Sequence, residues 1–130
     1  MIGLDTNILL RAATNDDPVR SPPARAIIAA LTPQRPAVIN SVVLVEFAWT
    51  LRTGYGHSRT DILAAIETMM RSACYLMPDR DAVNTALSRC HKDRLDFADA
   101  LIGSLNAHAG SKKTLTFDEK CASSTGFEAA

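Results

Sequence analysis

The sequence contains few aromatic residues and few cysteines, and it has neither a net charge nor a long hydrophobic run. Aromatic side chains make up 5% of the 130 residues, so the core must consist mainly of Ala, Leu, Ile and Val. The three cysteines show neither disulfide-framework nor zinc-ligand spacing, so we expect small buried side chains in a reducing compartment. No apolar run is long enough to cross a bilayer, and the first residues lack the features of a signal peptide. We therefore expect a cytoplasmic protein without membrane contacts.

The balance of charges limits the classes of partner. The chain has 14 basic and 14 acidic side chains, so its formal net charge is zero. This balance argues against a protein that binds nucleic acid through its overall charge, although a local basic groove is compatible with it. The apolar fraction of 47% and the charged fraction of 22% are those of an ordinary globular protein, and the length suits one domain over residues 1–130.

Short apolar runs alternate with longer segments of helical periodicity along the chain. Strands are expected at residues 2–4, 37–40, 74–77 and 113–116. Helices are expected at residues 6–13, 22–31, 42–52, 58–71, 79–91 and 96–108, with Ser41 as the N-cap of the third. This alternation predicts an α/β fold with a central parallel sheet of four or five short strands and helices on both faces. Functional sites of such sheets form beyond the carboxyl ends of the strands.

Acidic residues stand at several of these expected strand ends and helix starts. Asp5 follows the first strand and Asp118 follows the last, and each could instead be a helix cap or a turn residue. Asp96 and Asp99 open the sixth helix, where a capping box or a favourable interaction with the helix dipole would also explain them. For each of these residues alone, both the structural and the functional interpretation stay open.

Glu46 is the one charged side chain between residues 38 and 51, in an apolar helical segment. A helix that is apolar nearly all round is normally buried, and a buried carboxylate costs several kcal/mol unless it is paired or bound to a metal. An arginine partner or an opening onto solvent would be the structural alternative. Glu46 is therefore the strongest single indication of a functional acid.

Taken together, the acids are expected to converge at one edge of the parallel sheet. The set consists of Asp5, Glu46, Asp99 and Asp118. Four carboxylates at one place would raise each other's pKa values unless a cation neutralised them. Because all the donors are oxygen atoms, Mg²⁺ or Mn²⁺ suits such a site better than Zn²⁺. This chemistry fits phosphodiester hydrolysis. Basic residues that flank the acidic segments could hold a nucleic-acid backbone, and the candidates are Arg11, Arg52 and Arg94.

Four segments of the chain resemble the motifs of the PIN-domain family. They are residues 5–11 (DTNILLR), Glu46 in its apolar helix, residues 96–102 (DFADALI) and residues 115–118 (LTFD). In the order of these motifs and in chain length, the sequence is similar to VapC-type ribonuclease toxins of prokaryotic toxin–antitoxin pairs. The resemblance covers nearly the whole chain, and it implies a parallel sheet flanked by helices.

The resemblance also implies an activity and its residues. It implies cleavage of RNA that depends on Mg²⁺ or Mn²⁺, with the four acids as the metal-binding and catalytic residues. Supporting side chains near these acids would be Asp96, Thr6, Asn7, Ser41 and Thr116. It further implies a homodimer and a cognate antitoxin protein that blocks the site.

The C-terminal segment departs from the family pattern. Cys121 occupies a place where Phe is common, and few residues follow it, so the last strand is expected to be truncated or absent. Two alternatives to a ribonuclease stay open. One is a non-catalytic PIN-like module that binds RNA or a protein, which the intact set of four acids opposes. The other is a metal-dependent DNA nuclease or phosphatase, since the acids alone do not select the substrate.

Overall fold

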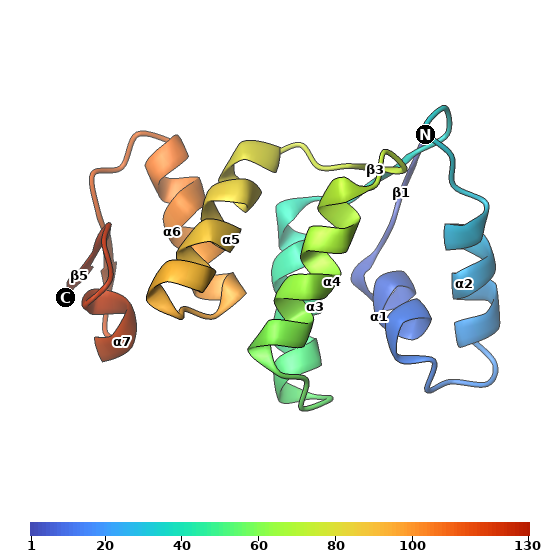
Figure 1. Ribbon diagram of the computed structural model, residues 1–130, viewed down its shortest axis with the longest axis horizontal. Helices are drawn as coiled ribbons and strands as arrows, with labels where there is room; N and C mark the ends of the chain where they lie inside the picture. Colours follow the sequence, from blue (N-terminus) through green and yellow to red (C-terminus); the bar gives the residue numbers. More distant parts are fainter. The chain divides into compact units, whose positions relative to one another are not determined.

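The computed structural model describes residues 1–130 and divides after Pro78 into two compact units (Figure 1). The first unit comprises Met1–Pro78 and the second comprises Asp79–Ala130. None of the helices has both the length and the apolar character that a bilayer crossing requires.

The first unit contains a parallel three-stranded sheet in the order β1-β2-β3. The residues Ile2, Ala37 and Tyr75 stand side by side in its register. Each connection between neighbouring strands is a pair of helices, which supplies the long crossover that parallel strands need. The elements are β1 (Ile2–Gly3), α1 (Thr6–Thr14), α2 (Ser21–Ala29), β2 (Ala37–Val38), α3 (Ser41–Thr53), α4 (Arg59–Arg71) and β3 (Tyr75–Leu76).

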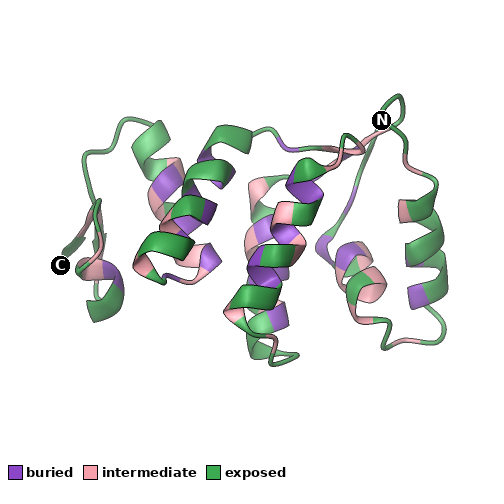
Figure 2. Cartoon of the chain, in the orientation of Figure 1, coloured by how far each residue is buried: buried purple, intermediate pink, exposed green.

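Apolar periodicity places the core of this unit between its sheet and helices. The largest side chains with almost no exposure are aliphatic, as the low aromatic content predicts: Ile39, Leu44, Leu51 and Ile66. Buried positions recur along α3 and α4, whereas α2 is mostly exposed (Figure 2). Helix α2 is nevertheless fixed at its start, where Ser21 and Ala24 are buried.

The N-cap of α3 differs from the prediction by one residue. The side chain of Asn40 accepts a hydrogen bond from the backbone N–H of Val43 at 3.0 Å, and Ser41 is already the first helical residue. The prediction of Ser41 as the cap is therefore wrong. Asn and Ser are comparably good caps, so the sequence alone could not choose between neighbours.

The second unit contains helices α5 and α6, which pack against each other, and a two-stranded parallel sheet. Its elements are α5 (Arg80–Asp93), α6 (Phe97–His108), β4 (Thr114–Thr116), α7 (Glu119–Ala122) and β5 (Phe127–Ala129). Strand β5 pairs with all three residues of β4. The last strand is therefore present with three residues, so the expectation that it could be absent is wrong, and a short helix precedes it.

The expected single sheet is present as two sheets, one of three strands and one of two. The α/β class and the parallel pairing agree with the prediction. The partition differs because each strand is only two or three residues long and finds its partners within its own unit. Periodicity predicts where strands lie, but it carries no information on which strands pair.

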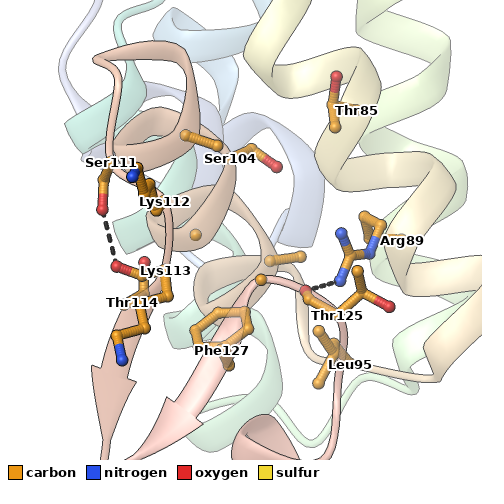
Figure 3. Close-up of a pocket in the computed structure, with 14 residues that line it drawn as sticks. Thr85, Arg89, Leu95, Ser104, Ser111, Lys112, Lys113, Thr114, Thr125 and Phe127 are labelled. Atoms are coloured by element: carbon orange, nitrogen blue, oxygen red, sulfur yellow. Dashed lines mark hydrogen bonds between the residues drawn. The ribbon is translucent and has the colours of Figure 1, made fainter.

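Strand β5 is held against α6 by the aromatic ring of Phe127, which lies at the wall of a small cavity of about 70 Å³ (Figure 3). A Cβ added at Gly103 would stand 2.7 Å from the ring's Cζ atom, so only glycine leaves room for this packing. Arg89 of α5 donates a hydrogen bond to the carbonyl of Thr125 and forms an ion pair with Asp93 at 2.9 Å. The contacts of Phe127 and Thr125 thus connect the segment before and within β5 to helices α6 and α5.

Candidate metal centre

Two of the predicted acids lie together in the second unit. Asp99, in the first turn of α6, and Asp118, the N-cap of α7, stand close to the thiol of Cys121. One ligand atom from each of the three residues lies within 4.8 Å of the other two. Asp99 is half-buried, Asp118 is exposed, and Cys121 is only 2% exposed. The cluster is thus open on the side of Asp118 and closed on the side of Cys121.

Local hydrogen bonds explain the position of Asp118. Its backbone N–H donates to Thr116 Oγ1 at 3.0 Å, and its Oδ1 accepts from the backbone N–H of Cys121 at 2.9 Å. Asp118 is therefore a helix cap, which was the structural interpretation of this residue, and it also stands beside Asp99. The two roles are compatible because a carboxylate has two oxygens and about four acceptor positions.

The electrostatics of the cluster are those of uncompensated negative charge. Partial burial raises the pKa of Asp99 above its usual value, and the nearby charges of Asp96 and Asp118 raise it further. A hydrogen bond from Cys121 and the charge of Lys120 act in the opposite direction without cancelling the shift. A bound cation would remove this penalty, because it favours the ionised form of each carboxyl.

Asp96 has the backbone position of an N-cap before α6, but its side chain makes no capping hydrogen bond. The capping-box alternative for Asp96 and Asp99 is therefore not formed. Since Asp96 is half-buried and its charge acts on Asp99, it belongs to the same acidic surroundings.

The other two acids lie in the first unit and are linked through one threonine. Asp5 is the N-cap of α1, and its Oδ1 accepts from the backbone N–H of Thr6 at 2.8 Å. The hydroxyl of Thr6 donates to Oε1 of Glu46 at 3.0 Å. Because Thr6 is only 7% exposed, this bond ties the carboxylate of α3 to the first residue of α1. Asn7, the next residue, is exposed.

The environment of Glu46 differs from the expectation. Glu46 is exposed, and so are Val42 and Trp49, which lie one turn before and one turn after it on the same face of α3. Helix α3 is apolar nearly all round, yet only part of its surface is buried within its unit. The structural alternative, in which the Glu46 side chain faces solvent, is therefore correct.

The three candidate arginines have different surroundings. Arg11 Nη1 lies 3.2 Å from Oδ1 of Asp16, and Arg11 is also close to Asp17. Hydrogen bonds from Tyr55, Thr14 and Arg11 lower the pKa of Asp16 to about 2. Arg11 is thus occupied by acidic neighbours.

Arg52 and Arg94 are exposed. Arg52 lies in the last turn of α3. Arg94 follows α5 with a φ of 58°, and its backbone N–H donates to the carbonyl of Cys90. Both cations stand at helix C-termini, where positive charge is favourable.

The structure thus describes two groups of predicted residues. Within the first unit it connects Glu46 to Thr6, the residue that follows Asp5, and within the second it brings Asp99 and Asp118 together. Cys121 was not among the predicted site residues, because a free cysteine usually behaves as a small buried hydrophobe. One signal in the sequence could have indicated Cys121. It stands three residues after Asp118, and in a helix that begins at such an acid this spacing places the two side chains near each other.

Comparison with known proteins agrees with the motifs. A family model described as the PIN domain matches residues 2–127. No curated protein matches the chain. PIN domains are in general metal-dependent nucleases, which act on nucleic acid as hydrolases, and the acidic cluster of the second unit accords with that chemistry. The match spans almost the entire sequence, and the chain therefore belongs to the PIN-domain family.

Proposed function

We propose that the protein is a divalent-metal-dependent endoribonuclease, the toxin of a VapBC-type toxin–antitoxin pair. The observation that carries the metal-dependent part is the pair Asp99 and Asp118, whose carboxylates stand together beside Cys121, with the pKa of Asp99 raised by burial and by the neighbouring acids. The order of the acidic motifs supports the narrower assignment to the VapC type. In this proposal residues 1–130 act as one nuclease domain.

The donor set fits a divalent cation. Carboxylate oxygens are the ligands that Mg²⁺ and Mn²⁺ prefer, and at least one position near the ion must stay open for the substrate. The exposure of Asp118 leaves such an opening. We propose Asp5, Glu46, Asp99 and Asp118 as the acids that serve the metal, with Asp96 as an additional negative charge.

A divalent cation, when bound, would stabilise the negative charge that develops on the phosphate and lower the pKa of the attacking water. The chain's own residues hold the reactants. Asp118 is oriented by its capping bond, and the carboxylate of Glu46 is oriented by the hydroxyl of Thr6. Acids fixed in this way lose little freedom when substrate binds, which favours a productive geometry.

The substrate and partners follow from the same proposal. RNA would lie with its phosphates toward the candidate cations Arg11, Arg52 and Arg94, of which Arg52 and Arg94 are exposed. Asn7, Ser41 and Thr116 would support the acids. We further propose a cytoplasmic homodimer that a cognate antitoxin inhibits, and copurification with the product of an adjacent short reading frame would test this partner.

Cleavage of matched RNA and DNA oligonucleotides, with Mn²⁺ or Mg²⁺ added to the full-length protein, tests the activity. Asp99→Asn and Asp5→Asn should each reduce RNA cleavage by at least about a hundredfold, because a missing metal-site acid removes several kcal/mol of transition-state stabilisation. Asp81→Asn and Asp61→Asn are matched controls, since each replaces an exposed acid in the first turn of another helix. Both controls should cleave RNA at the rate of the unmodified protein.

Three results would contradict the proposal. Full activity of the purified Asp99→Asn protein would exclude the acids as the metal site. Equal cleavage of DNA and RNA would show that the protein is a less selective nuclease and not a ribonuclease. Binding of RNA without turnover at any metal concentration would favour a non-catalytic PIN module.

A further inference from the structure

The acidic cluster of the second unit contains a third donor of a different kind. Cys121 lies in α7, 2% exposed, and takes no part in a disulfide. Its sulfur atom lies within 4.8 Å of a carboxylate oxygen of both Asp99 and Asp118. A buried sulfur atom thus faces the two carboxylates that the proposed function assigns to the metal.

The distances allow all three side chains to reach one ion. A zinc ion lies about 2.3 Å from a cysteine sulfur and about 2.0–2.2 Å from a carboxylate oxygen. The three donor atoms lie within 4.8 Å of one another, near the separation of two donors that share one ion at these distances. The backbone positions of the three residues are fixed by α6 and by the capped helix α7.

The chemistry of the donors then determines the preferred ion. Magnesium is a hard cation that takes oxygen ligands, whereas zinc, cobalt and cadmium bind thiolate sulfur well. We propose that Cys121 is a metal ligand of this cluster and that Asp99, Asp118 and Cys121 together bind thiophilic divalent cations in preference to Mg²⁺. This inference rests on the proposed function only in that the two carboxylates belong to the same metal site.

Coordination of sulfur is coupled to a proton. When the ion binds, a metal–sulfur bond replaces the S–H bond, and the proton leaves to the solvent. Mg²⁺ takes oxygen ligands, so it would be held by the carboxylates without a metal–sulfur bond. One cluster therefore has two modes, an oxygen mode for hard ions and a sulfur mode for thiophilic ions.

Titration of the full-length protein with Co²⁺ tests the inference, because cobalt bound to thiolate absorbs in the near ultraviolet through sulfur-to-metal charge transfer. The unmodified protein should develop this band, and Cys121→Ser and Asp99→Asn should weaken or abolish it. Cys90→Ser is the matched control, since Cys90 is also buried in the second unit but lies outside the cluster. Competition with Zn²⁺ should show about a tenfold or greater loss of zinc affinity in Cys121→Ser, with Mg²⁺ affinity changed by less than about twofold.

Two measurements on the unmodified protein test the inference even if a variant fails to fold. X-ray absorption at the cobalt edge and cadmium NMR each report whether sulfur is among the ligands, and both should detect it. Oxygen and nitrogen ligands alone in the unmodified protein would overturn the inference, as would a charge-transfer band of unchanged intensity in Cys121→Ser. A sulfur ligand in a protein that cleaves no RNA would uphold the inference and reject the proposed function. Metal-dependent cleavage without a sulfur ligand would do the reverse.

Discussion

At the scale of single residues, Asp99 combines a structural cost with a proposed role. Its carboxyl group is half-buried beside other acids, which raises its pKa above the usual value. A folded-state pKa above the unfolded value means that the folded protein binds more protons between the two values. Stability is therefore lost as the pH rises through that interval, and the full penalty is present at neutral pH.

Replacing Asp99 with Asn should raise the stability of the metal-free protein at neutral pH and remove its response to metal. Urea unfolding in the presence of a chelator should give Asp99→Asn a higher midpoint than the unmodified protein. Mn²⁺ at a hundred times its dissociation constant should stabilise the unmodified protein by about 2.7 kcal/mol and the variant by much less.

Asp81→Asn serves as the control for this experiment, and its metal response should equal that of the unmodified protein. If Asp99→Asn unfolded at lower urea than the unmodified protein under chelation, the carboxylate would be a stabilising group. The electrostatic description of the cluster would then be wrong.

Residue environments were the least predictable feature of the site. The positions of Asp5 and Asp118 after strands could be recognised in the sequence, because a strand end followed by an acid is a local pattern. The exposure of Glu46 could not be recognised in the sequence. It depends on which face of the apolar helix α3 packs against the rest of its unit. Cys121 was missed because one of its two acidic neighbours, Asp99, comes from α6, about twenty residues earlier in the chain.

At the scale of elements, the packing of β5 on α6 depends on the absence of a side chain at Gly103. A Cβ there would stand 2.7 Å from Cζ and 2.8 Å from Cε2 of Phe127. Gly103→Ala should therefore displace the ring and loosen β5, at a cost of about 1–3 kcal/mol, as for other overpacked sites. Glycine is otherwise unfavourable in a helix, so an alanine without a clash would have stabilised α6.

A double-mutant cycle checks this assignment. Phe127→Leu shortens the side chain, so the combination of Gly103→Ala and Phe127→Leu should be less destabilised than the sum of the two single changes. Urea unfolding measures each term. Additive effects would show that the alanine is tolerated without contact to the ring, and the packing of β5 would then have another origin.

Element types were more predictable than their ends and partners. The helical segments were recognised by apolar residues three and four positions apart, and this periodicity is a property of each segment alone. Strand β5 was not recognised, because Phe127–Ala129 follows a short helix and lacks an apolar run of its own. Its strand conformation depends on pairing with β4, which no local pattern reports.

At the scale of the whole molecule, the balanced charge sets the way in which RNA can be bound. With 14 basic and 14 acidic side chains, the protein has no overall attraction for a polyanion. Several cations are also occupied by acids: Arg11 by Asp16, Arg89 by Asp93 and Lys113 by Glu128. Attraction must then come from a small number of local contacts.

This reasoning predicts a shallow salt dependence of RNA binding. If about three cations each contact one phosphate of a single strand, the slope of log K against log salt should be about −2. Fluorescence anisotropy with Asp99→Asn, which should bind RNA without cleaving it, measures the slope. Arg94→Gln should make it shallower by about 0.7, whereas Arg11→Gln should leave it nearly unchanged, since Arg11 is paired with Asp16. A slope of about −5 or steeper would show that many more phosphates are contacted than a neutral molecule with a few local cations can provide.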